Sequence, residues 1–162
     1  MNEKQKLFLQ KAIIEAKKYS EIAAETDIKH EEMSRWWSEL KEEREELAKI
    51  RQIWLRKCPT TDYWAFHNWH TQTERKCHYC GITEEEIQKL IAENKIVTKR
   101  LTTRGRSLEI ERLEPNEKYD NLQNLVYCCY WCNNAKTDEF TAEEFKPIGK
   151  EFNKIWKNRL DK

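Results

Sequence analysis

Glycine and proline are scarce in this sequence of 162 residues, which contains three of each. An all-β fold needs more of these turn-forming residues, so the composition favours long helices. No stretch approaches the roughly 18 apolar residues of a membrane-spanning helix, and we expect no membrane partner. The start, Met1 to Lys11, does not have the pattern of a signal peptide. We therefore expect a protein of the reducing cytosol.

A strong net charge is also lacking, since 30 basic residues against 29 acidic ones give +1. A general affinity for polyanions is therefore not indicated. The basic residues are nevertheless unevenly distributed, and one stretch between Lys95 and Arg106 contains no acid. Its side chains are candidate phosphate contacts of DNA, and a solvated surface is the alternative. The candidates are Lys99, Arg100, Arg104 and Arg106.

Tryptophan is abundant, with seven residues whose rings can supply much of the core of a small protein. The length fits one compact domain with a smaller module, or two small modules. Three regions are predicted from the pattern along the chain. They are a helical segment over 1–57, an aromatic-rich linker over 58–76 and a metal-binding module over 77–162.

The first region is predicted to be helical almost throughout, with Ser20 as the N-cap of a short helix that ends at Thr26. The next helix begins near Lys29 or His30, and the apolar spacing around this break is typical of a helix-turn-helix. That second helix would present Lys29 and Arg35 to DNA. A helical hairpin that only packs is the alternative.

Apolar residues then recur at three- and four-residue steps from Met33 to Trp54. Such a seam indicates either a short coiled-coil homodimer or packing on the C-terminal module. The aromatic side chains of 58–76 have two interpretations as well. We favour packing between modules over stacking on DNA bases.

The sequence contains six cysteines, all of which lie between Cys58 and Cys132. Two CxxC pairs, Cys77 with Cys80 and Cys129 with Cys132, supply the four thiolates of a tetrahedral structural zinc site. The alternative is four ordinary buried cysteines. Cys58 and Cys128 are left over, although Cys128 adjoins a predicted ligand.

Between the two pairs, the alternation of Leu108 to Leu113 predicts a strand, and Leu125 to Cys128 predicts a second one. A helix follows Cys132. Capping boxes at Thr83 and at Thr141 predict two further helices, the second with an apolar core-facing side from Phe145 to Trp156. Strand, loop, strand and helix, joined by zinc, form the ββα-metal arrangement.

The run from Leu108 to Phe145 (LEIERLEPNEKYDNLQNLVYCCYWCNNAKTDEFTAEEF) resembles phage and bacterial HNH proteins of the endonuclease VII type. With the first cysteine pair, the resemblance covers roughly residues 77 to 145. It implies an α+β, mostly helical fold with a zinc-stapled ββα-metal module. It also implies DNA as partner, Mg²⁺ or Mn²⁺ as catalytic ion, and the cytoplasm of a bacterium or a phage-infected host cell.

Carried over onto this sequence, the resemblance places the catalytic metal ligands at Glu111 and Asn133 and the loop asparagine at Asn124. The position of the general-base histidine is occupied by Arg112, which stays protonated and cannot accept a proton from water. Arg112 would instead hold the scissile phosphate, with Lys136 as a further phosphate contact. The remaining candidate bases are His67, His70, His78 and Tyr119.

A divalent-metal-dependent DNA endonuclease is the function that this set of residues favours. A DNA-binding regulator with a degenerate HNH zinc module and an N-terminal helix-turn-helix is the first alternative. A zinc scaffold for protein contacts is the second. Glu109 and Glu114 are expected to lie on a solvated face.

Overall fold

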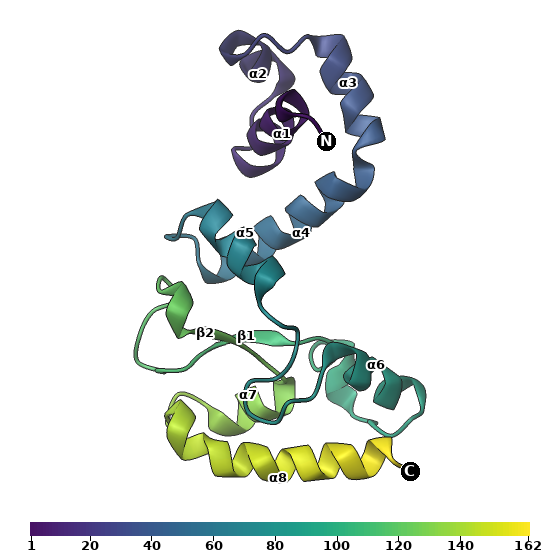
Figure 1. The fold of residues 1–162 in the computed structure, drawn as a ribbon, viewed down its shortest axis with the longest axis vertical. Helices are drawn as coiled ribbons and strands as arrows, with labels where there is room; N and C mark the ends of the chain where they lie inside the picture. Colours follow the sequence, from purple (N-terminus) through teal and green to yellow (C-terminus); the bar gives the residue numbers. More distant parts are fainter. The chain divides into compact units, whose positions relative to one another are not determined.

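The computed structural model describes residues 1–162 and divides into two compact units, residues 1–70 and 71–162 (Figure 1). The chain is mostly helical with one two-stranded sheet, which agrees with the predicted α+β class. No helix combines the length and the apolar run needed to cross a membrane. The elements are α1 (Glu3–Leu9), η1 (Gln10–Ile14), α2 (Tyr19–Glu25), α3 (His30–Glu39), α4 (Lys41–Lys57), α5 (Tyr63–Gln72), α6 (Glu84–Ala92), η2 (Lys99–Thr102), β1 (Glu109–Arg112), η3 (Leu122–Asn124), β2 (Leu125–Cys128), α7 (Tyr130–Lys136) and α8 (Ala142–Leu160).

The helices of the first unit follow the sequence pattern, with two corrections. The break before His30 is confirmed, but α2 begins at Tyr19, with Lys18 in the N-cap position instead of Ser20. The backbone N–H of Lys18 donates to the carboxylate of Glu21 at 2.6 Å, which caps the helix in place of a serine hydroxyl. The apolar spacing from Met33 to Trp54 predicts one helix that continues from His30 to about Arg56, but the chain is interrupted at Leu40 (φ −98°, ψ 39°), so α3 and α4 are separate.

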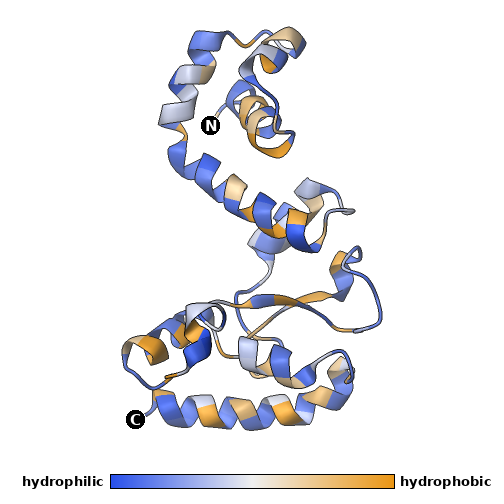
Figure 2. Ribbon diagram, turned by 180° about the vertical axis from the view of Figure 1, so that it is seen from behind, coloured by the Kyte–Doolittle hydropathy of each residue, from blue (hydrophilic) through white to orange (hydrophobic).

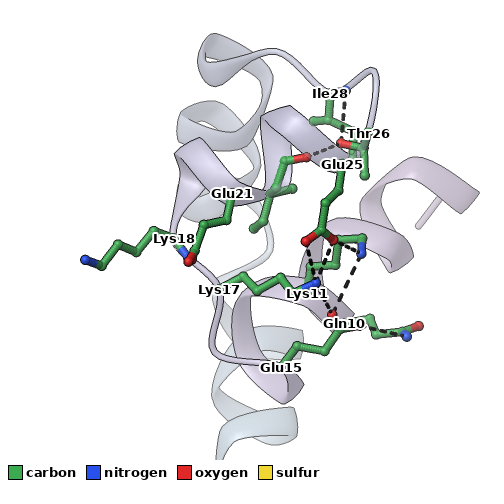
Figure 3. Close-up of polar contacts among 10 residues, drawn as sticks. Gln10, Lys11, Glu15, Lys17, Lys18, Glu21, Glu25, Thr26 and Ile28 are labelled. Carbon is green, nitrogen blue, oxygen red and sulfur yellow. Dashed lines mark hydrogen bonds and ion pairs between the residues drawn. The ribbon is translucent and has the colours of Figure 1, made fainter.

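A cluster of charged side chains ties η1 to α2 (Figure 3). The carboxylate of Glu25 accepts hydrogen bonds from the ammonium groups of Lys11 and Lys17, each at 2.6 Å. Lys17 also pairs with Glu15 at 3.0 Å. The hydrogen bonds from Lys11 and Lys17 lower the pKa of Glu25 to about 2. The cluster therefore favours the ionised carboxylate and fixes the connection between the two helices.

The apolar seam expected between Met33 and Trp54 is covered by helices of its own unit. Phe8 of α1 lies against Trp36, with ring centroids 6.1 Å apart. The hydroxyl of Tyr63 in α5 donates to the carbonyl of Leu47 at 3.3 Å. Neither a second chain nor the C-terminal module is needed to bury the seam, so it gives no support to a homodimer. The buried seam residues are Met33, Trp36, Leu40, Leu47 and Ile50.

The α2–α3 hairpin buries most of the apolar positions that suggested a helix-turn-helix, including Ile22, Ile28 and Met33. The two basic side chains assigned to DNA contact, Lys29 and Arg35, are exposed at the start and on the surface of α3. Arg35 lies 3.7 Å from Glu39. DNA binding by this hairpin stays a prediction.

The second unit is built in layers around the β1–β2 hairpin (Figure 1). The two strands are antiparallel, with Glu109 opposite Cys128 and Glu111 opposite Val126. Helix α7 packs against β1, and α8 packs against both α7 and α6. The order of strand, loop, strand and helix is the one predicted from the sequence.

Helix α8 begins at the predicted capping box, where the Thr141 hydroxyl accepts from the N–H of Glu144. Apolar residues recur along it among hydrophilic ones (Figure 2), but not all of them are core. Phe145 and Trp156 are buried, whereas Ile148 and Ile155 are each 44% exposed. The expectation that both isoleucines lie in the core is wrong, because the helix packs through the face that contains Gly149.

Candidate metal and nucleic-acid site

Four buried cysteines meet where the first loop of the second unit reaches the start of α7. The Sγ atoms of Cys77, Cys80, Cys129 and Cys132 all lie within 4.8 Å of one another. Gly81, at φ +72°, turns the chain after Cys80, and its N–H donates to the carbonyl of Cys77 at 2.8 Å. Cys129 is the N-cap of α7, and its Sγ accepts from the N–H of Cys132. Local turn geometry thus aims all four thiols at one point.

The chemistry of this cluster fits a structural zinc ion. A tetrahedral ion with Zn–S bonds of about 2.3 Å separates its sulfurs by about 3.8 Å, and the Sγ atoms of Cys80 and Cys129 lie 3.7 Å apart. Hydrogen bonds from Cys128 and the other thiols lower the pKa of Cys77, whereas the hydrogen bond with Cys129 raises that of Cys132. Four thiolates this close together would repel one another, and a cation bound among them would balance their charge.

The two cysteines outside the predicted zinc set are also buried, and of these only Cys128 lies beside the cluster, where it hydrogen-bonds with Cys77. Cys58 lies in the first unit, where burial raises its pKa to about 11. The Sγ of Cys128 donates to the carbonyl of Cys129 at 3.4 Å. The structure therefore gathers the predicted CxxC pairs and leaves both remaining cysteines out of the four-residue cluster.

Next to the cluster, strand β1 turns two carboxylates toward α7. Glu109 and Glu111 share this face because side chains alternate along a strand. The amide nitrogen of Asn133 donates to Glu109 Oε2 at 2.6 Å. One turn further along α7, the Nζ of Lys136 lies 3.6 Å from Glu111 Oε1. Each carboxylate thus faces its own partner on the helix.

The Glu111–Lys136 pair is enclosed, with 8% of the glutamate side chain and none of the lysine side chain exposed. The ammonium makes no hydrogen bond. This corrects the expectation that Lys136 contacts phosphate, because a side chain without exposed surface cannot reach DNA in this conformation. Lys136 instead places a positive charge beside the residue to which the resemblance assigns a metal-binding role.

Glu109 also departs from expectation, since its side chain is 19% exposed and engaged on two sides. Besides Asn133, it contacts Arg104, whose Nε and Nη2 donate to Oε1 and Oε2 at 2.8 and 2.5 Å. The Arg104 guanidinium lies over the ring of Tyr130, 4.9 Å from its centroid. The alternation of side chains along β1 is enough to place Glu109 and Glu111 on one face. The contact of Arg104 with Glu109 depends in addition on the path of the loop that precedes the strand.

Arg112 points to the other face of β1, toward the loop that joins the strands. Its Nη1 donates to the carbonyl of Glu117 at 2.8 Å, and its guanidinium lies 4.7 Å from the Tyr119 ring centroid. Tyr119 is therefore the candidate base that the fold brings to Arg112. His78 packs instead against Tyr79, with ring centroids 5.0 Å apart.

Asn124 is buried at the end of this loop and hydrogen-bonds with both backbone groups of Glu114. Its Oδ1 accepts from the N–H of Glu114 at 2.8 Å, and its Nδ2 donates to the Glu114 carbonyl at 3.2 Å. The amide thus braces the segment that follows β1. The Glu114 side chain is exposed, as expected.

The remaining predicted phosphate contacts lie on a loop between α6 and β1, here called the basic loop (residues 97–106). Lys99, Arg100 and Arg106 are exposed there. The Nε of Arg106 donates to the carbonyl of Leu101 at 2.7 Å, which folds the loop on itself. Gly105, at φ +87°, lies against the ring of Tyr130. Three cations therefore face solvent, and the fourth, Arg104, turns toward β1.

The oxygen atoms between β1 and α7 are of the type that binds a divalent ion, because Mg²⁺ and Mn²⁺ take carboxylate and amide oxygens as ligands. The two residues assigned by resemblance differ in their surroundings. Asn133 contacts Glu109, and Glu111 lies against an ammonium group. The oxygen set of this face is thus Glu109, Glu111 and Asn133, with Lys136 as a resident counter-charge.

No family model matches this chain, and a search of curated proteins finds no match. Among solved structures, the chain is similar to PacI, described as a rare-cutting HNH restriction endonuclease with an extraordinary mechanism of DNA perturbation. The TM-score is 0.53 and the sequence identity 26%, over 68% of this chain and 81% of that one. The resemblance to HNH proteins therefore has support from a solved structure, and the chain has an HNH-like fold with a four-cysteine cluster compatible with zinc.

Proposed function

We propose that this protein is a divalent-metal-dependent endonuclease that hydrolyses phosphodiester bonds of DNA. The similarity to an HNH restriction endonuclease supports the substrate and the reaction class. The observation that carries the proposal is the contact between Asn133 of α7 and Glu109 of β1 at 2.6 Å, beside Glu111. It gathers oxygen donors at the helix–strand junction where the resemblance places the catalytic ion.

In this proposal the four cysteines hold a structural zinc ion that fixes the start of α7 against the first CxxC loop. Asn133 follows Cys132 directly in α7, so its placement against β1 depends on that cluster. Asn133 and a carboxylate of β1 would bind Mg²⁺ or Mn²⁺. The resemblance assigns Glu111 to this role, and the contact geometry adds Glu109. The bound ion would offset the negative charge that develops on the phosphate during hydrolysis.

Arg112 and Tyr119 would act from the other face of β1. The guanidinium of Arg112 can hold a phosphate oxygen and stabilise its developing charge, but it cannot take a proton. Tyr119, beside it, is the candidate for that proton transfer. Asn124 keeps the loop in place through its hydrogen bonds with the Glu114 backbone.

Cleavage of long, sequence-rich DNA with Mg²⁺ or Mn²⁺ tests this function. Wild type is compared with Glu109→Ala, Glu111→Ala, Asn133→Ala and Tyr119→Phe. Glu114→Ala, at an exposed side chain after β1, serves as the control. We expect metal-dependent cutting that Asn133→Ala and at least one β1 variant lose, while Glu114→Ala retains it.

The alternative of a regulator that binds DNA without cutting is favoured by Lys136, which already neutralises Glu111, and by Arg112 in the place of a base. Binding of DNA without any cutting, by a protein that holds zinc, would support this alternative and contradict the endonuclease. Absence of both binding and cutting would contradict both functions.

A further inference from the structure

The basic loop has one cation that differs from the others. Arg104 is 47% exposed, yet its guanidinium reaches β1 and lies over Tyr130 at the start of α7. It is therefore held at the junction that carries Glu109 and Asn133, although it comes from a segment outside the ββα elements. The side chains of the other three basic residues of the loop make no hydrogen bond or ion pair with β1 or α7.

The contacts of Arg104 leave it able to bind a second anion. A guanidinium has five N–H groups in a planar fork, and in Arg104 two of them donate to Glu109. The remaining N–H groups make no hydrogen bond within the protein. Half-exposed ion pairs of this kind are weak in water, because both charges stay hydrated. A phosphate group can therefore share or take over this guanidinium.

Before a divalent ion binds, the charges of the face between β1 and α7 are balanced only if such a cation is present. Glu109 and Glu111 carry two negative charges, and Lys136 balances the one on Glu111 from inside the protein. Arg104 balances the one on Glu109. Without Arg104, a phosphodiester that approaches the ion-free protein would meet an uncompensated carboxylate. With it, the face is neutral and presents free donors in the fork geometry that matches phosphate oxygens.

We propose that Arg104 is a phosphate-binding residue of the candidate active site, held ready by Glu109 and Tyr130 before DNA arrives. The inference rests on the proposed function, because it takes DNA as the substrate. It adds a residue from the basic loop to the reacting centre, whereas the other cations of that loop are exposed to solvent. Tyr130 orients the guanidinium by stacking, and Glu109 fixes its direction.

The test compares Arg104→Ala and Arg104→Lys with wild type. Arg44→Ala is the matched control, since Arg44 also lies over an aromatic ring, 4.1 Å from the Trp37 centroid, and donates to a backbone carbonyl. Binding of a fluorescein-labelled DNA duplex is measured by anisotropy without divalent ion, over a series of salt concentrations. Cleavage with Mg²⁺ or Mn²⁺ is measured at saturating DNA, and thermal unfolding checks the fold of each variant.

We expect Arg104→Ala to lower the cleavage rate by roughly 100- to 1,000-fold, the range seen when one donor to a transition-state anion is removed. The slope of log affinity against log salt should fall by about one, the signature of one lost phosphate contact. Lysine should restore the salt slope but only part of the rate, because it lacks the fork. Arg44→Ala should change neither quantity.

If wild type cleaves DNA and Arg104→Ala keeps both the cleavage rate and the salt slope, the inference is overturned while the proposed function stands. Binding without cutting by wild type would overturn the endonuclease, and the salt slope would then decide alone whether Arg104 contacts phosphate. No binding by wild type would overturn both. A variant that fails to fold as alanine is replaced by Arg104→Gln, which keeps the length of the stem and removes the charge.

Discussion

The ammonium of Lys136 lies 3.6 Å from the carboxylate of Glu111 in a place where none of the lysine side chain is exposed. A buried ion pair recovers its desolvation cost only through its own attraction. Losing one partner leaves the other as an uncompensated charge in the interior. The pair therefore joins β1 to α7 in a way that makes each residue depend on the other.

Replacing Lys136 by methionine should destabilise the second unit by about 3–5 kcal/mol, because the charge of Glu111 then has no partner. Chemical denaturation followed by circular dichroism measures this loss. The double variant with Glu111→Leu should recover most of it, since both charges are gone. A single variant as stable as wild type would show that the pair does not contribute to stability.

Removal of the metal should unfold the second unit and leave the first one folded. The free energy of zinc binding supports modules with small cores, and the ion balances the charge of the four thiolates that bind it. We expect one zinc ion per chain by elemental analysis, and loss of helical signal from residues 71–162 on chelation. Cys132→Ala should lose the zinc, and the control Cys58→Ala should keep it. Zinc retained by Cys132→Ala would contradict the ligand set.

Gly149 allows α8 to approach the first CxxC loop closely. A Cβ atom at this position would lie 2.7 Å from the carbonyl oxygen of Tyr79, and the neighbouring Asn153 donates to the carbonyl of Cys80 at 2.6 Å. Gly149→Ala should therefore destabilise the second unit by about 1–3 kcal/mol through overpacking. Thermal unfolding and zinc retention measure the effect.

Alanine is a better helix former than glycine by about 1 kcal/mol, so a net loss shows that the backbone clash outweighs helix propensity. Lys150→Ala, at the next and exposed position, supplies the control. A stabilised Gly149→Ala variant would mean that α8 does not pack this tightly on Tyr79.

The charged cluster makes the stability of the first unit depend on pH in the acidic range. The folded-state pKa of Glu25 is lowered from 4.5 to about 2 by Lys11 and Lys17. A lowered pKa contributes stability above pH 4.5, and this contribution is lost as the pH falls toward 2. Melting temperatures of wild type and Glu25→Gln should therefore differ at pH 6 and converge near pH 2. Glu31→Gln, at an exposed residue of α3 without an ion pair, should run parallel to wild type.

The parts of the fold that could be predicted are those whose structure is determined by residues close together in the sequence. The scarcity of glycine and proline predicted the helices, and the capping boxes at Thr83 and Thr141 located the starts of α6 and α8. Alternation of side chains predicted β1 and β2. The spacing of the CxxC pairs predicted the cysteine cluster, because few other roles need four cysteines in that pattern.

What could not be predicted depends on the path of the chain between these elements. The burial of Lys136 follows from the packing of α7 on β1, and no local pattern distinguishes it from an exposed lysine. The contact of Arg104 with Glu109 depends on the turn of the basic loop at Gly105. The exposure of Ile148 and Ile155 depends on which face of α8 the rest of the unit covers. In each case tertiary packing decides between two interpretations that sequence pattern leaves equal.

Cys80 and Cys129 are 49 positions apart along the chain, although their sulfurs lie 3.7 Å apart. The cysteine cluster thus closes a ring that contains α6, the basic loop and the β1–β2 hairpin. The entropy lost in closing a flexible ring grows only with the logarithm of its length, by about 0.6 kcal/mol for each doubling. Longer versions of the basic loop would therefore cost the module little, so this loop can vary in length while the closure stays constant.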